Sequence, residues 1–153
     1  MKWLEHRIPP PLVGASLGVA MWWLARQFPP PLLDGRVRVA LAILLALGGL
    51  AFLAPATRAF VRASTTVNPL KPESASALVV SGVYRFTRNP MYLGFALLLL
   101  AWAAWLAAPI ALLGPLLFAG YITRFQILPE ERALKQRFGA DFDEYCKRVR
   151  RWL

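Results

Sequence analysis

Three long stretches without a charged side chain constrain the fold of this sequence more than any other feature. No Asp, Glu, Lys or Arg occurs in residues 8–25, 39–57 or 89–123, which are 18, 19 and 35 residues long. A helix needs about 20 residues to cross the roughly 30 Å hydrocarbon core of a bilayer. The sequence is also 58% hydrophobic, against about 45–50% in soluble domains. These features predict an all-α integral membrane protein.

The longest stretch exceeds the length of one membrane crossing. As a single helix its 35 residues would measure about 50 Å, and Pro109 near its middle removes a helical hydrogen bond. We therefore expect a tight hairpin of two helices here. The full prediction is one domain over residues 1–153, a bundle with four transmembrane helices at about 11–28, 37–57, 91–107 and 110–127. Gly48 and Gly49 in the second helix permit the close approach of a neighbouring helix.

The placement of basic residues predicts how the chain sits in the membrane. Of 18 Lys and Arg residues, 15 precede the first span, lie between spans two and three, or follow residue 123. Basic residues gather on the cytoplasmic side of membrane proteins, so both termini, the loop 58–90 and the tail 129–153 are expected in the cytoplasm. We expect a multi-pass protein of the bacterial inner membrane. Its first span is retained, since no small-x-small cleavage site follows it.

The net charge of +10 also raises the possibility of a nucleic-acid partner. The basic residues are not interleaved with stacking aromatic side chains on a soluble fold, as they are in nucleic-acid binding domains. We therefore expect membrane lipids and no nucleic acid as partners. The sequence does not indicate an oligomeric state.

The segments that flank the hairpin have patterns of their own. In the loop, Pro69 and Pro72 exclude a regular helix, and we expect an extended segment along the membrane face. Asn89 and Pro90 suit the N-cap and the first turn of the third span. After Pro129, apolar residues recur at spacings of 4, 4 and 3 from residue 134 to 145. This spacing predicts an amphipathic helix, or two helices broken at Gly139, that lies on the membrane or caps the bundle.

Polar side chains gather at the cytoplasmic boundary of the predicted hairpin. Glu130 and Glu131 follow the fourth span directly, where acids either complement the helix dipole or accept hydrogen bonds from a ligand. Arg88 precedes the third span and either reaches the lipid headgroups or binds an anion. Two tyrosines, Tyr84 and Tyr92, flank the same turn. Such a cluster would bring a water-soluble cofactor and a lipid-embedded substrate together.

The scarcity of histidine and cysteine excludes several chemistries. His6 is the single histidine and Cys146 the single cysteine. A metal site built from several histidines and an internal disulfide are therefore excluded, and we expect no metal cofactor.

Three sequence blocks resemble a known family. Residues 82–94, GVYRFTRNPMYLG, resemble the G-x-Y-x-x-x-R-[HN]-P-x-Y-x-G signature of the isoprenylcysteine carboxyl methyltransferase-like family, whose members are integral membrane enzymes that use S-adenosylmethionine and are related to the phospholipid N-methyltransferases. Residues 130–145 resemble its second block, E-E-x-x-L-x-x-x-[FY]-G-x-x-[FY]-x-x-Y, and residues 148–153, RVRRWL, resemble the R-V-P-R-W-L ending of many bacterial members. The resemblance covers about residues 64–153. Leu70 departs from the family's histidine, and Arg150 from its proline.

The resemblance implies a function and a set of site residues. The implied activity is methyl transfer from S-adenosylmethionine, without a metal, to an isoprenylcysteine-like carboxylate, an amine lipid headgroup or a small thiol. Arg88 and Glu131 would be catalytic, and Tyr145 and Arg148 would lie on the substrate side. The implied cofactor-binding residues are Tyr84, Arg88, Asn89, Pro90, Tyr92, Glu130 and Glu131. The resemblance does not distinguish which of the two glutamates contacts the cofactor.

Two alternative functions belong to other classes of protein. A membrane interaction or assembly protein of the same fold would keep the apolar hairpin without needing a cofactor. A small transporter is disfavoured, because charged residues occur only near the ends of the predicted spans and polar groups deep in the membrane usually mark a transport path.

Overall fold

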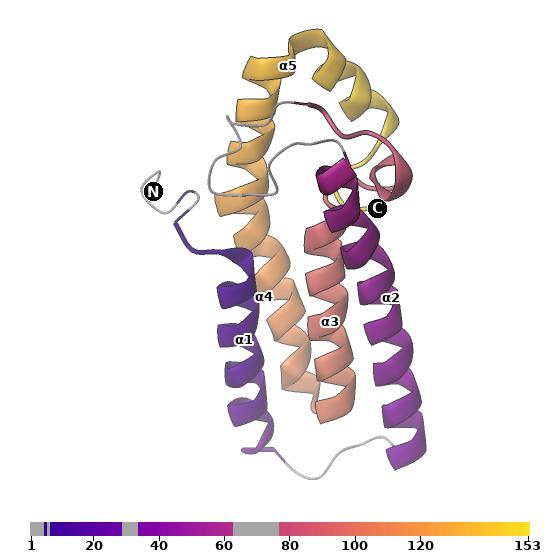
Figure 1. Cartoon of the computed structure of the whole chain (residues 1–153). Coiled ribbons are helices and arrows are strands. Elements are labelled where there is room, and N and C mark those ends of the chain that lie inside the picture. Colours follow the sequence, from indigo (N-terminus) through magenta and orange to yellow (C-terminus); the bar gives the residue numbers. More distant parts are fainter. Residues whose placement is uncertain (1–4, 6, 29–33, 63–76) are drawn as a thin grey trace.

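The described part of the chain is helical: helices α1, α2, α3 and α4 lie side by side, and α5 extends beyond their ends (Figure 1). The computed structural model describes residues 5, 7–28, 34–62 and 77–153, and no strand occurs among them, which confirms the all-α prediction for these residues. The predicted extended segment around Pro69 and the departure at Leu70 lie outside the described residues. The elements are α1 (Pro10–Ala25), α2 (Gly35–Arg62), α3 (Pro90–Leu106), α4 (Leu113–Ile122) and α5 (Leu128–Arg148), with short 3-10 helices η3 (Gly82–Arg85) and η4 (Pro109–Leu112) and a π-helix η5 (Thr123–Ile127).

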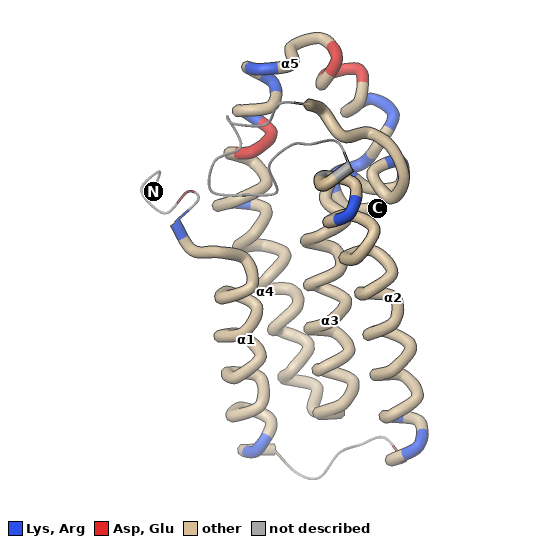
Figure 2. The backbone as a smooth tube through the Cα atoms, in the orientation of Figure 1, with Lys and Arg blue, Asp and Glu red and all other residues tan. Residues whose placement is uncertain are grey.

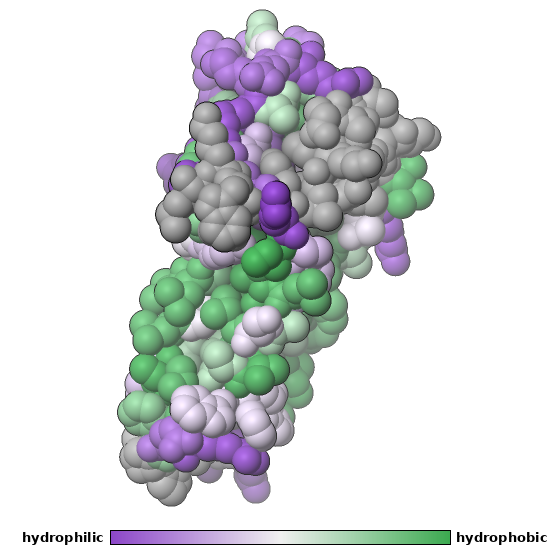
Figure 3. Space-filling model, turned by 90° about the vertical axis from the view of Figure 1, so that its left-hand side faces the viewer, coloured by the Kyte–Doolittle hydropathy of each residue, from purple (hydrophilic) through white to green (hydrophobic). Residues whose placement is uncertain are grey.

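The surface of the bundle is apolar where a soluble protein would be polar. Two helical segments, Gly35–Ala59 and Pro109–Arg148, are long and apolar enough to cross a membrane, and α1 and α3 are shorter apolar helices. On α2, Leu44 and Leu47 leave 68% and 59% of their surface exposed. Figure 3 shows an apolar band between two polar ends. Hydrocarbon, not water, is the solvent that suits such a band.

The predicted hairpin at Pro109 is present. Helix α3 ends at Leu106, and Ala107 then adopts a left-handed conformation with φ 49°, a geometry that commonly closes a helix. Its backbone N–H donates to the Ala103 carbonyl at 2.9 Å. Pro109 opens the 3-10 turn η4, which leads into α4. The turn reverses the chain, so α3 and α4 lie antiparallel and the segments at their other ends come together.

The tail does not begin as a separate helix, which corrects the prediction of a new helix at Pro129. Helix α4 passes through the π turn η5 into α5 without a break, and the Leu128 N–H donates to the Thr123 carbonyl, five residues back. Because the hydrogen-bond ladder shifts at this turn, the proline is accommodated. The break comes later, at Gly139, with φ 52° and ψ −120°. The prediction of two helices broken at Gly139 is thus confirmed.

The outer helices also differ from their predicted bounds. Helix α1 ends at Ala25, where residue 28 was predicted. Helix α2 runs from residue 35 to 62, where 37–57 was predicted, and includes Pro55. The missing N–H of a proline removes one bond of the ladder, and the apolar turns on both sides preserve the helix.

Helices α2 and α3 touch through their backbones at two glycines. A Cβ added to Gly49 would lie 2.9 Å from the Gly94 carbonyl oxygen, and one added to Gly94 would lie 2.8 Å from the Gly49 carbonyl oxygen. Only hydrogen fits at either position. The neighbouring Gly48 has its nearest contact, the Leu97 side chain, at 4.0 Å from such a Cβ. The predicted close approach is confirmed, and it depends on Gly49.

We predict that Gly49→Ala separates α2 from α3 and destabilises the protein by roughly 1–3 kcal/mol, the usual cost of overpacking. Gly48→Ala is the matched control, because its methyl group meets no backbone atom and alanine favours a helix by about 0.5–1 kcal/mol. The free energy of unfolding in mixed detergent–lipid micelles measures both. Equal stability of the two variants would contradict the glycine contact.

Candidate active site

The residues before α3 form a turn that places several predicted site residues at the end of the bundle. Gly82, with φ 61°, opens the 3-10 turn η3, a conformation that glycine adopts without strain. Pro90 occupies the first turn of α3 and is fully buried. Asn89 lies at the N-cap, as predicted, but its side chain makes no capping hydrogen bond. Its amide instead donates to the Arg151 carbonyl at 2.9 Å, because the C-terminal end of the chain lies against this turn.

This C-terminal segment, residues 149–152, binds to the turn through backbone atoms. The Arg88 N–H donates to the Arg150 carbonyl at 2.9 Å, and the Thr87 hydroxyl donates to the Arg151 carbonyl at 3.1 Å. Proline has the same carbonyl, so the departure at Arg150 preserves this contact. The Trp152 indole N–H donates to the Thr123 hydroxyl of η5 at 3.1 Å. The π turn thus anchors the segment from the other side.

Two arginines hold Glu131 between them. The Arg88 Nη2 atom lies 2.7 Å from Glu131 Oε1, and Arg151 contacts both oxygens, with Nε at 3.0 Å and Nη2 at 2.7 Å. The Arg88 and Glu131 side chains are 12% and 17% exposed, so solvent screens this pair little. Burial alone would raise the pKa of Glu131, but the hydrogen bonds from Arg151 and Arg88 outweigh it and lower the pKa. Glu131 is therefore ionised.

The adjacent acid has the opposite environment. Glu130 accepts a hydrogen bond from the buried Tyr92 hydroxyl of α3. Burial removes the hydration of Glu130 and raises its pKa to about 8. The hydrogen bond from Tyr92 lowers this pKa by a smaller amount, and the negative charge of Glu131 raises it further. Both acids lie beyond the apolar stretch 110–127. At neutral pH one of the pair is neutral and the other is charged.

Two further tyrosines connect η3 to the end of α5. The Tyr145 hydroxyl donates to the Tyr84 carbonyl at 2.7 Å, and both side chains are buried. Burial raises the pKa of both hydroxyls, so they stay protonated. Phe142 and Val149 pack with Tyr145 in a small apolar cluster, which holds the broken α5 over the turn.

The N-terminal end of the described chain is tied to the same region. Glu5 bridges two arginines, Arg124 at 3.1 Å and Arg132 at 2.5 Å. The buried Gln126 side chain of η5 donates to the Ile8 carbonyl at 3.0 Å. These contacts fix the junction of α4 and α5, from which Glu130 and Glu131 project.

The structure brings together most of the predicted residues, which come from two segments about forty positions apart. Arg148 is the exception, since it lies exposed at the end of α5, outside the contacts described above. The sequence did not identify Arg151 as a site residue. Arg151 belongs to the closing block RVRRWL, which contains three arginines, and only the fold shows which of them contacts Glu131. In the described part of the chain, no three His, Cys, Asp or Glu side chains gather to hold a metal ion. The residues that come together are Arg88, Asn89, Pro90, Tyr92, Glu130 and Glu131, with Tyr84 and Tyr145 packed beside them.

The raised pKa of Glu130 predicts a pH-dependent stability. The unfolded chain releases this proton near pH 4.5 and the folded chain near about 8. Stability due to the protonated acid is therefore complete below the lower value and is lost as the pH rises toward the upper one. Glu130→Gln keeps an acceptor for Tyr92 but does not titrate. The difference between its melting temperature and that of the wild type should therefore shift in favour of the variant as the pH rises between these two values.

The control for this measurement is Glu144→Gln, an exposed acid of the same helix, which should parallel the wild type. Glu131 does not affect this comparison. Its pKa is lowered, so its contribution to stability is lost only in more acidic solution. A constant difference between Glu130→Gln and the wild type across this range would show that Glu130 is ionised throughout.

Comparisons with known proteins give the family. Residues 37–141 match the sequence model described as phospholipid methyltransferase. The chain is 35% identical over 91 residues to protein-S-isoprenylcysteine O-methyltransferase B of Arabidopsis thaliana, covering 58% of this chain and 45% of that protein. It is 41% identical over 70 residues to methanethiol S-methyltransferase 1 of Bradyrhizobium diazoefficiens, covering 44% of this chain and 22% of that protein.

A third relative is an uncharacterized protein of Haemophilus influenzae, 46% identical over 63 residues, which are 41% of this chain and 100% of that protein. The chain thus spans less than half the length of the two relatives named as methyltransferases. No solved structure matches it. The family match begins within α2, before the sequence blocks, and covers most of the chain. It confirms the resemblance found in the sequence: the chain belongs to the phospholipid methyltransferase family.

Proposed function

We propose that this protein transfers a methyl group from S-adenosylmethionine to a lipophilic or membrane-delivered acceptor at the cytoplasmic face of the membrane. One observation supports this most strongly. The Arg88–Glu131 ion pair and the Tyr92–Glu130 hydrogen bond join the two family blocks at one end of the apolar bundle. A polar site at that end of the bundle suits a reaction between a soluble cofactor and a substrate held in the bilayer.

The proposed topology has four spans, with both termini in the cytoplasm and the hairpin tip outside. Figure 2 shows most of the Lys and Arg residues around α5 and the upper ends of the helices. At the opposite end, the Arg26 guanidinium lies 4.0 Å from the Trp22 ring and that of Arg38 lies 5.2 Å from the Trp105 ring. Aromatic residues favour the membrane interface, and cation–π contact stabilises an arginine there. These pairs support an interface at the far end as well.

The chemistry of the residues fits the cofactor. S-adenosylmethionine has a carboxylate, an amine, hydroxyl groups and a sulfonium cation. Arg88 is a cation for the carboxylate, and its buried Nε atom has no hydrogen-bond partner among the described residues. Glu130 and Glu131 are acceptors for the amine or the hydroxyls. The faces of Tyr84 and Tyr92 suit an adenine ring or a cation.

The protein's contribution is orientation rather than acid–base chemistry. Held by Arg88 and the two glutamates, the cofactor would supply an electrophilic methyl group for in-line transfer to an oxygen, nitrogen or sulfur of the acceptor, with a neutral thioether as the leaving group. Arg88 is proposed to bind the cofactor's carboxylate. The proposed role of Glu131 is to hold the Arg88 side chain in the direction that this contact needs. Tyr145 and Arg148 would contact the acceptor. Orientation of two reactants in a dry site is worth about 7–11 kcal/mol of barrier.

We predict that S-adenosylhomocysteine stabilises the protein against heat, by about 2.7 kcal/mol at one hundred times its dissociation constant. Glu131→Ala leaves Arg88 and Arg151 without their shared acid, and Glu130→Ala removes the partner of Tyr92, so both variants should lose most of this stabilisation. Lys147→Ala, at an exposed position of α5, is the control that should keep it. Thermal unfolding in detergent with and without the ligand measures all four proteins.

If the wild type is not stabilised at millimolar ligand, the protein is a membrane interaction protein of the same fold and the proposed activity is wrong. If both glutamate variants bind as tightly as the wild type, the activity stands but the site assignment fails. Transfer of a radiolabelled methyl group to lipid, thiol and prenylcysteine acceptors then identifies the acceptor class.

The proposed topology predicts one-sided labelling of single cysteines. Cys146 is the only natural cysteine, so Cys146→Ser gives a cysteine-free background. In spheroplasts, a membrane-impermeant maleimide should label Leu112→Cys, at the hairpin tip, and should label Lys147→Cys only after the membrane is opened. Labelling of both from outside would contradict the four-span arrangement.

A further inference from the structure

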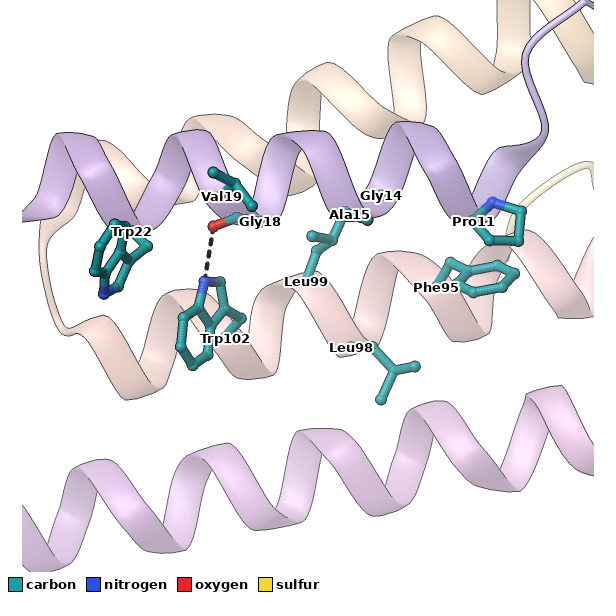
Figure 4. Close-up of a pocket in the computed structure, with 10 residues that line it drawn as sticks. All are labelled: Pro11, Gly14, Ala15, Gly18, Val19, Trp22, Phe95, Leu98, Leu99 and Trp102. Atoms are coloured by element: carbon teal, nitrogen blue, oxygen red, sulfur yellow. Dashed lines mark hydrogen bonds between the residues drawn. The ribbon is translucent and has the colours of Figure 1, made fainter.

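An apolar groove of about 670 Å³ lies between α1 and α3. Figure 4 shows it along α1, from Pro11 and Phe95 at one end to Trp22 and Trp102 at the other. Its remaining lining residues are equally uncharged: Gly14, Ala15, Gly18, Val19, Leu98 and Leu99. The volume is in the range of small-molecule sites, about 300–1,000 Å³.

Gly18 of α1 is not used for helix packing, unlike Gly49 of α2 and Gly94 of α3. Small residues four apart, here Gly14 and Gly18, usually let two membrane helices touch. At Gly49 and Gly94 that contact is made, and a Cβ would lie within 3 Å of the opposite backbone. At Gly18 an added Cβ has no atom within 4 Å. The small face of α1 therefore leaves a space that its neighbour α3 does not fill.

The groove begins about one helical turn from the candidate active site, and two tryptophans, Trp22 and Trp102, lie at its other end. Phe95 lies one helical turn, about 4.5 Å, from Tyr92, which binds Glu130, and both belong to or pack against one apolar cluster with Leu99. At the other end, the Trp102 indole N–H donates to the Gly18 carbonyl at 3.0 Å, across the space between the helices (Figure 4). This bond and the Trp22 ring limit how far a ligand extends.

We propose that this groove binds a single hydrocarbon chain of the methyl acceptor and that the tryptophans at its far end set the longest chain that fits. An uncharged groove that begins about one helical turn from Tyr92 and runs along the helices suits a linear apolar ligand whose head group stays at Tyr92. The proposal rests on the proposed function only for the nature of that head group.

The test is photo-crosslinking of the full chain in phosphatidylcholine nanodiscs, with hexadecylamine that has a diazirine at the end of its chain. We expect saturable labelling of the α1 and α3 segments that line the groove, prevented by excess hexadecylamine and not by butylamine. Gly18→Leu places a side chain in the open space and should lower this labelling about tenfold, the scale on which a pocket discriminates small changes in an apolar ligand.

Gly120→Leu is the matched control, because Gly120 on α4 is equally open and lies outside the groove. It should leave the labelling unchanged. Labelling that does not saturate, or that falls equally on the exposed Leu116 and Leu117 of α4, would show bulk lipid in the groove and overturn the proposal. A groove occupied by a second copy of the chain would also overturn it, and would appear as an oligomer lost in Gly18→Leu.

Stabilisation by S-adenosylhomocysteine, measured on the same samples, separates this proposal from the proposed function. If Gly18→Leu is stabilised like the wild type, it is folded with an intact cofactor site, and its loss of labelling then reports the groove alone. Saturable labelling without any stabilisation by the ligand would leave the groove in place and contradict the methyltransferase activity.

Discussion

The shared ion pairs of Glu131 fix the relation between the three segments of the candidate site. Arg88 comes from the turn before α3, Glu131 from the start of α5, and Arg151 from the C-terminal segment. Removing one partner of a buried ion pair typically costs 3–5 kcal/mol, because the other charge stays buried and uncompensated. None of the three segments can move alone without that cost. The position of Tyr92 against Glu130 and the route of the C-terminal segment across Asn89 therefore depend on this one carboxylate.

The charge-free hairpin is what makes these ion pairs possible. Arg88 and Glu131 are 43 positions apart, and the turn at Pro109 returns the chain to the end of the bundle from which it started. The glycines then divide the bundle into a closed side and an open one. Backbone contact at Gly49 and Gly94 seals α2 against α3, whereas Gly18 leaves space between α1 and α3. Glycine thus allows close helix packing on one face of α3 and leaves a groove on the other.

The sequence predicts those features that follow from local chemistry. Charge-free stretches and Pro109 were enough to predict the hairpin, and the turn residues before Pro90 were enough to predict that Arg88 and Asn89 lie at one end of the bundle with Glu131. Features that depend on tertiary contacts were not predictable. The amide of Asn89 does not cap its helix because the Arg151 carbonyl lies within reach, and the π turn passes Pro129 without a break because Thr123 and Gln126 are held from both termini. No local sequence pattern indicates that Arg151 pairs with Glu131 or that Glu5 bridges two arginines.

The two adjacent acids decide the electrostatic character of the site. If both were ionised, Arg88 and Arg151 would be neutralised and an anionic ligand would gain nothing from entering. The pKa of Glu130 is raised by burial to about 8, whereas that of Glu131 is lowered by its two arginines despite burial. At neutral pH the cluster therefore has two positive charges and one negative charge. That positive surplus supports the proposed binding of the cofactor's carboxylate, with the uncharged Glu130 and the Tyr92 ring beside it.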